Sequence, residues 1–195
     1  MRSKRTFFAA WFLGLTALCL PTSQALEIHG VDFPDQVQLE NSGLILNGTA
    51  TRTVWGLKVY VVGLFLSDRC HNCETIMSEH SLPKRVLISM LRKVSVDKFG
   101  STIQENIDNN FSEAEKVKYR KELAAFLACF GNGTDLDSGS SVTIDFVPSK
   151  GMVVGVNDHQ FEPIQGDEFY HAMLRLWIGE PLQKSIKEGL LGKAG

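Results

Sequence analysis

The sequence predicts an α+β fold in which an antiparallel β-sheet packs against a layer of helices. Three observations support this fold class. Apolar runs at residues 44–53 and 58–67 follow one another along the chain and indicate strands with a buried face. Residues 142–147 and 152–156 indicate a hairpin around Ser149-Lys150-Gly151. Helical spacing is confined to the middle and the end of the chain, as in folds that segregate helices from strands.

The remaining elements follow from local signals. The segment from Glu27 to Leu39 predicts short strands interrupted at Gly30 and Pro34, and residues 85–91 predict another strand. A short helix is expected over residues 73–79. Apolar residues from Val96 to Phe111 recur at near-helical spacing, and Ser112 with Glu115 forms a capping box for a helix that reaches Phe130. The last two predicted helices cover residues 167–178 and 181–191, the second with proline in its first turn.

The first 25 residues indicate a signal peptide. Arg2, Lys4 and Arg5 precede an apolar run from Phe7 to Leu20, and small residues end at Ala25. We therefore expect one domain over residues 26–195, exported to the periplasm or secreted. No later segment is long and apolar enough to span a membrane.

The charge of the chain limits its partners. The net charge is −2, and cleavage of the leader would remove three of the 20 basic residues. No basic stripe or tail remains, so nucleic acid is not an expected partner. The histidines show no metal-ligand spacing, and we expect neither a metal nor a cofactor.

Arg52 lies within the most apolar stretch of the sequence. A guanidinium cannot lose its charge when it is buried, so it needs a hydrogen-bonded anion or carbonyl as a partner. That partner could be a structural carboxylate of the chain or a bound ligand.

Six blocks of the sequence together carry a family signature: residues 46–53, 58–66, 91–95 with 105–106, 166–169, 174–181 and 190–192. In these blocks the chain resembles the chalcone isomerase-like family, most closely its exported bacterial branch within the chalcone isomerase and fatty-acid-binding superfamily. The resemblance covers nearly the whole chain after the leader, in the same order. It implies an open-faced sandwich with a ligand cleft between the sheet and the helices.

The resemblance suggests two alternative functions. Arg52 matches the cleft arginine of the plant isomerases, and Asn106 matches their asparagine. Phe99 and Leu176 occupy positions that are polar in those enzymes, so the catalytic set is incomplete. Non-catalytic fatty-acid-binding members pair the arginine with a tyrosine on the next strand, and Tyr60 is present here.

The spacing of Arg52 and Tyr60 allows a geometric prediction. If the chain turns back near Gly56, the two residues become a cross-strand pair with Cβ atoms about 5 Å apart on one face. A guanidinium and a phenol could then hold one carboxylate together.

Cys70-His71-Asn72-Cys73 is a second chemical signal. A helix amino terminus can lower a thiol pKa, so a thiol-redox role is one alternative. We favour a local disulfide between Cys70 and Cys73, because an exported chain meets an oxidising compartment.

The sequence thus predicts a binder of a small or long-chain apolar carboxylate, such as a fatty acid. Its site would comprise Arg52, Tyr60, Asn106, Phe99 and Leu176. An isomerase or lyase acting on an enone or phenolic compound, with Arg52 as oxyanion stabiliser, is the alternative.

Overall fold

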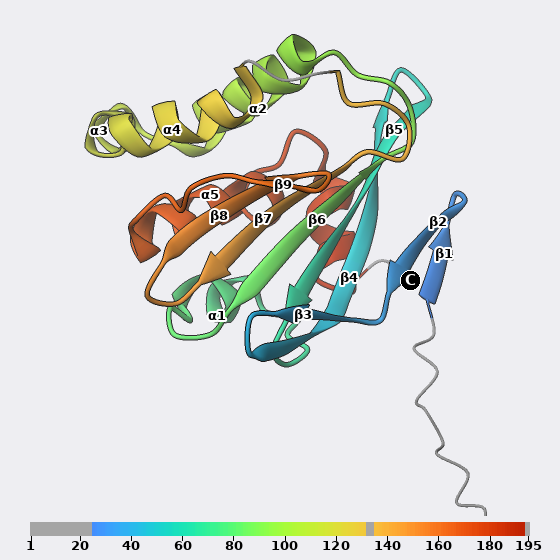
Figure 1. The fold of residues 1–195 in the computed structure, drawn as a ribbon, viewed down its shortest axis with the longest axis horizontal. Coiled ribbons are helices and arrows are strands. Elements are labelled where there is room, and N and C mark those ends of the chain that lie inside the picture. Colours follow the sequence, from blue (N-terminus) through green and yellow to red (C-terminus); the bar gives the residue numbers. More distant parts are fainter. Residues whose placement is uncertain (1–24, 132–134, 194–195) are drawn as a thin grey trace, which may run out of the picture.

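The computed structural model describes residues 25–131 and 135–193. The predicted leader lies outside the described residues, except for Ala25, which begins the first strand. The described chain forms two layers, a curled sheet and the helices that cover it (Figure 1).

The sheet is an antiparallel meander of seven strands in chain order, which confirms the predicted α+β fold class. A separate two-stranded ribbon, β1–β2, precedes it. The strands are β1 Ala25–Ile28, β2 Val31–Pro34, β3 Gln36–Leu39, β4 Ser42–Val54, β5 Leu57–Leu66, β6 Lys84–Met90, β7 Ser141–Val147, β8 Gly151–Val156 and β9 His159–Gln160.

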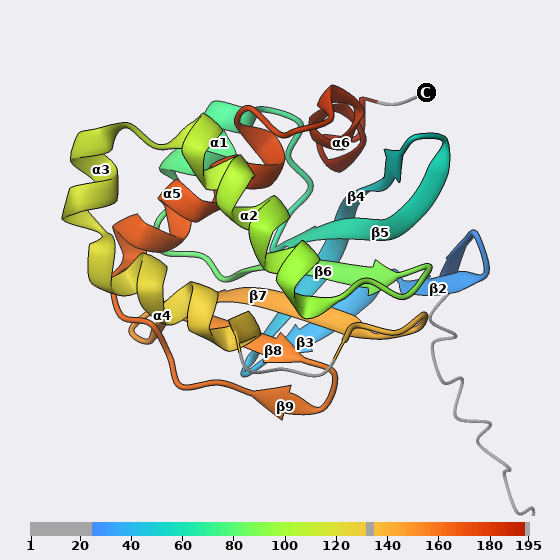
Figure 2. The same cartoon turned by 90° about the horizontal axis from the view of Figure 1, so that it is seen from above.

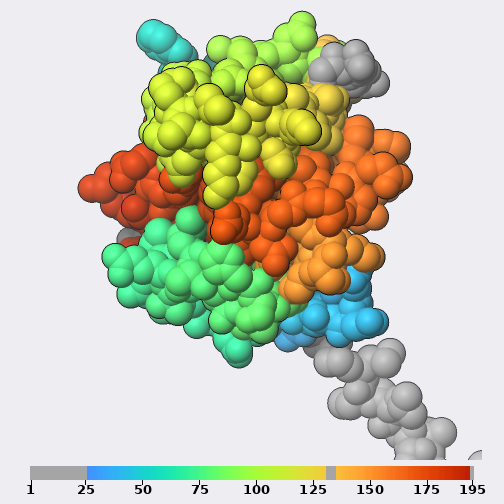
Figure 3. Space-filling view, turned by 90° about the vertical axis from the view of Figure 1, so that its left-hand side faces the viewer, coloured from blue at the N-terminus to red at the C-terminus, as the bar shows by residue number. Residues whose placement is uncertain are grey.

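The helical layer brings together segments from the middle and the end of the chain (Figure 2). Figure 3 shows the end of the molecule formed by α1, α3, α4 and α5, with α3–α4 lying over α5. The helices are α1 Cys73–Ser78, α2 Val96–Asn110, α3 Glu113–Lys118, α4 Arg120–Gly131, α5 Asp167–Ile178 and α6 Lys184–Leu190.

The two faces of the sheet bury different sets of side chains, as strand alternation requires. Val62 and Leu64 of β5 point into the main core beneath the helices. Val61 and Phe65 point to the opposite face, where Phe33 of β2 covers them. Tyr60 has the same parity as Val62, so it faces the helices.

Two predicted helices differ from the observed ones. The helix expected over residues 112–130 is divided at Tyr119, although the capping box of Ser112 and Glu115 is present. The Tyr119 ring packs against Phe111 and Phe169 at this break, so tertiary contacts determine its position. The last helix begins at Lys184 and not at Pro181.

A buried ion pair joins β6 to β7. Arg85 lies opposite Asp145 and donates two hydrogen bonds to its carboxylate, of 2.6 Å from Nε and 2.7 Å from Nη2. The Asp145 side chain is inaccessible to solvent, so removal of its partner would leave a buried charge unpaired.

We expect Arg85→Met to reduce the free energy of unfolding by about 3–5 kcal/mol. The double variant Arg85→Met/Asp145→Leu should recover most of that loss, because it removes both charges. Urea denaturation of both variants and the parent measures the effect. A double variant that is less stable than Arg85→Met would contradict this account of the pair.

Candidate functional site

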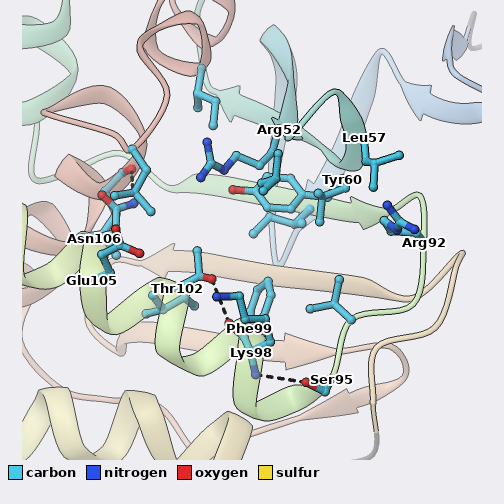
Figure 4. A pocket seen from close by; sticks show the side chains of 18 of the residues that line it. Arg52, Leu57, Tyr60, Arg92, Ser95, Lys98, Phe99, Thr102, Glu105 and Asn106 are labelled. Carbon is cyan, nitrogen blue, oxygen red and sulfur yellow. Dashed lines mark hydrogen bonds between the residues drawn. The ribbon is translucent and has the colours of Figure 1, made fainter.

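A cavity of about 590 Å³ lies between the β4–β5 hairpin and helices α2, α5 and α6. Its volume falls within the range of roughly 300–1,000 Å³ that is usual for small-molecule sites. Most of the lining is apolar, and Arg52, Tyr60 and Asn106 supply polar groups (Figure 4). The apolar lining residues include Val59, Ile88, Val94, Phe99, Ile103, Leu176, Trp177, Leu182 and Ile186.

Arg52 and Tyr60 are cross-strand partners, which confirms the predicted register. A turn centred near Gly56 does not by itself produce this register. Val54 pairs with Leu57 across a two-residue turn, which by itself would place Arg52 opposite Val59. A bulge on β5 shifts the pairing by one residue and brings Tyr60 opposite Arg52.

The Arg52 guanidinium has a neutral partner in the protein. Its Nη1 donates a 3.3 Å hydrogen bond to Oε1 of Gln183. The same oxygen accepts a 2.8 Å bond from the Thr53 backbone N–H. Within residues 25–131 and 135–193, Arg52 forms no salt bridge. A guanidinium has five N–H donors, so most of them remain available to a ligand.

Tyr60 presents a second donor beside Arg52. Withdrawal of the phenol from water raises its pKa to about 12, while the Arg52 charge acts in the opposite direction. The hydroxyl is therefore protonated at neutral pH. In Figure 4 the hydroxyl points toward the side of the cavity that the Arg52 guanidinium also faces.

The position of α6 determines where Gln183 meets the hairpin. Nε2 of Gln183 donates to the Thr51 carbonyl at 3.0 Å, so this residue bonds to β4 through both ends of its amide. At the other end of the helix, Asn47 is buried at a second bulge and donates to the Leu190 carbonyl at 2.8 Å. These two residues hold α6 along β4.

Close backbone contact between α6 and β4 depends on glycine. A Cβ at Gly189 would lie 2.3 Å from the Thr49 carbonyl oxygen, and a Cβ at Gly48 would lie 2.2 Å from the Gly189 carbonyl oxygen. Neither contact is sterically possible. The helix therefore approaches the strand more closely than any side chain would permit.

We expect Gly189→Ala to lower stability by about 1–3 kcal/mol, because the new methyl group must push α6 away from β4. Gly100 in α2 is a matched control, since a Cβ there meets nothing within 4 Å. Gly100→Ala should instead raise stability by about 1 kcal/mol through helix propensity. Thermal melts of both variants test the difference, and equal shifts would contradict it.

The other predicted site residues also line the cavity. Asn106 of α2 donates a 2.8 Å hydrogen bond to the Leu176 carbonyl of α5, and it accepts one from Asn110. Its amide is therefore engaged in joining two helices as well as bordering the cavity. Phe99 and Leu176 are buried and contribute apolar surface.

Sequence reasoning missed several basic residues at the cavity. Arg92, Lys93 and Lys98 line it, against one acidic lining residue among those described, Glu105. Lys93 is paired with Asp135 at 3.2 Å and Asp137 at 3.6 Å, whereas Arg92 and Lys98 form no salt bridge with a described residue. These three basic residues lie close together in the sequence, between the end of β6 and the first turn of α2, and this clustering could have suggested a basic site. Local sequence cannot show, however, whether such side chains point toward a cavity.

The predicted disulfide between Cys70 and Cys73 is wrong, since both are free thiols. The Cys73 thiol donates to the Ile178 carbonyl at 3.0 Å, and the Cys70 thiol donates to the Asn72 carbonyl at 3.5 Å. Asn72 is the N-cap of α1, and this turn directs the two thiols to different partners. Burial raises the pKa of Cys73, which is opposite to the shift that a reactive thiolate requires.

No group of three or more His, Cys, Asp or Glu side chains within the described chain is arranged to hold a metal ion. Among the helices of the described residues, none is long and apolar enough to cross a membrane.

The fold and the cavity together define an open-faced α+β sandwich with a ligand-sized cleft between its layers. A family model described as chalcone isomerase-like matches residues 25–192, and the chain belongs to this family. The crystal structure of a fatty-acid binding protein from Arabidopsis thaliana is similar, with a TM-score of 0.64 and 16% sequence identity. The match covers 84% of this chain and 92% of the plant protein. A search of curated proteins found no match.

Proposed function

We propose that this protein is a non-catalytic binder of a small or long-chain apolar carboxylate, with the carboxylate held by Arg52 and Tyr60. The observation that carries the proposal is the state of Arg52. It lines a largely apolar cavity and forms no salt bridge with a described residue, while the Tyr60 phenol lies beside it. The similar plant protein is a fatty-acid binding protein, which is consistent with such a ligand.

The chemistry of the two side chains favours an anionic ligand. Arg52 offers a permanent positive charge and forked donors that match a carboxylate. Tyr60 is protonated at neutral pH, as any phenol is whose pKa is about 10 or higher, and burial raises its pKa further to about 12, so it can donate to a second carboxylate contact. The apolar walls suit a hydrocarbon chain, whose burial contributes about 0.8 kcal/mol per methylene.

We expect Arg52→Gln to weaken binding of a fatty acid by roughly 10- to 150-fold, because hydrogen bonds to a charged group contribute about 1.5–3 kcal/mol. Isothermal titration calorimetry on residues 25–195, which contain every described element, measures the loss. Arg120→Gln is the matched control: it removes the same charge from an exposed position on α4, outside the cavity, and should leave affinity unchanged.

A methyl ester of the same acid separates the contact with the carboxylate from any general effect of the substitution. The parent should bind the acid much more tightly than the ester, and Arg52→Gln should bind both about equally. If the preference for the acid survives in Arg52→Gln, another group holds the carboxylate and the proposal fails.

Affinity should also rise with the length of the acyl chain. Each added methylene should tighten binding about fourfold until the cavity is full. Arg52→Gln should weaken the binding of every acid in the series by the same factor and leave the gain per methylene unchanged, because the substitution affects only the carboxylate end of the ligand. A series of saturated acids tests this, and an affinity independent of chain length would exclude an apolar binding cavity.

The isomerase alternative uses the same donors, since Arg52 and Tyr60 could stabilise an oxyanion. Turnover of a chalcone above background by the parent, lost in Arg52→Gln, would favour it over the binder.

The proposal also places the protein in an exported compartment, periplasmic or extracellular, because of the leader sequence. Amino-terminal sequencing of the protein recovered from its source tests the expected cleavage after Ala25.

A further inference from the structure

The turn of the β4–β5 hairpin carries an exposed apolar surface beside the cavity. We call residues 54–57 the hairpin tip. The Trp55 side chain is 96% exposed, Leu57 is 54% exposed and Val54 is 36% exposed. All three residues also line the cavity, so the tip borders the cavity entrance.

The backbone of the hairpin tip makes this tryptophan unusual. Trp55 has φ 53° and Gly56 has φ 78°, as in the two-residue turns in which both central residues adopt positive φ. Asn and Gly are the preferred residues in such turns, whereas a bulky residue at positive φ is strained. Neither turn geometry nor packing therefore explains a fully exposed indole at this position.

Basic side chains lie beside the hairpin tip and along the cavity that it borders. Lys58 follows it directly, and its Nζ lies 3.0 Å from Nδ1 of His29. The Leu91 N–H donates to the Val59 carbonyl at 2.9 Å, which places Arg92 close to the tip (Figure 4). Lys58, Arg92 and Lys98 are exposed and form no salt bridge with a described residue. Asp97 and Glu105 are the acidic residues of α2 nearest to this group in the sequence.

We propose that the hairpin tip docks on the surface of an anionic phospholipid bilayer, with Trp55 in the interfacial layer and the cavity entrance facing the lipid. Tryptophan is enriched at membrane interfaces because one part of its ring is apolar and the N–H can remain hydrated. Lys58, Arg92 and Lys98 would add attraction to anionic headgroups.

Charge favours a bilayer over a second copy of this chain. Two hairpin tips placed face to face would bring their unpaired basic residues together, and like charges across an interface are unfavourable. The apolar area is also a single projecting turn, which suits insertion into headgroups better than a protein interface of standard size. The hairpin projects from the molecule on the side away from α3 (Figures 1 and 2).

The location suggests a route for the ligand. If the cavity holds a fatty acid, which rests on the function proposed above, docking would let the acid pass between bilayer and cavity with little exposure to water. Docking itself requires no acid, so it can be tested separately.

The test is co-sedimentation of residues 25–195 with phosphatidylcholine vesicles that contain or lack phosphatidylglycerol, in the absence of fatty acid. The parent should bind the anionic vesicles more tightly than the neutral ones, and added salt should weaken the binding. Trp55→Asn should reduce binding about tenfold or more, since it removes the largest inserted apolar side chain. Asparagine suits this turn, so the variant should fold at least as stably as the parent.

Val117→Asn provides the matched control. Val117 is 76% exposed on α3, at the end of the molecule away from the hairpin. This variant also replaces an exposed apolar side chain with asparagine, and it should bind vesicles like the parent.

A second measurement reports on the depth of Trp55. Lipids brominated in their acyl chains should quench the tryptophan fluorescence of the parent more than that of Trp55→Asn.

Each contrary outcome has a distinct meaning. If the parent does not bind anionic vesicles, or if Trp55→Asn binds as tightly as the parent, the inference is overturned. A dimer in sedimentation velocity that Trp55→Asn converts to a monomer would assign the tip to a second copy of the chain instead. Failure of the proposed function would appear separately, as absence of acid binding by the parent in solution.

Discussion

The register of the β4–β5 hairpin is the constraint on which the site depends. A two-residue turn at Trp55 and Gly56 would pair Arg52 with Val59, and the bulge on β5 replaces this pairing with Tyr60. A slip of one residue in a strand moves side chains to the opposite face. Without the bulge, Val59 and not Tyr60 would lie opposite Arg52. The cavity would then contain the Arg52 guanidinium without the Tyr60 hydroxyl beside it.

A comparison of two arginines shows why Arg52 is the functional candidate. Arg85 and Arg52 both lie in strands of the same sheet, and both are partly withdrawn from solvent. Arg85 is satisfied by two short hydrogen bonds to the buried carboxylate of Asp145, so it serves the fold. Arg52 has one 3.3 Å bond to an amide oxygen and faces a cavity. An incompletely satisfied charge next to apolar walls is the property that a carboxylate ligand would complete.

The surroundings of Arg52 are organised by α6, a short helix far away in the sequence. Asn47 and Gln183 attach its two ends to β4, and Gly189 allows its backbone to contact the strand. Gln183 has an extended backbone at the N-cap position, which is consistent with the helix starting three residues later than the sequence predicted. The residue that immediately precedes the helix is also the one whose side chain contacts Arg52.

Local periodicity and short hairpins were enough to predict the strands, most helices and the α+β class. The pairing of Arg52 with Tyr60 was suggested by the family resemblance, and the bulge on β5 that produces it was not predicted. The family resemblance also identified Phe99, Asn106 and Leu176 as residues that border one cavity. Other features required the folded chain, because they depend on partners that are distant in the sequence. These are the break at Tyr119, the free thiols of Cys70 and Cys73 and the Gln183 contact. The exposure of Trp55 required the folded chain too: a turn near Gly56 was predicted, but local sequence does not show whether such a turn packs against another element or projects into solvent, as this one does.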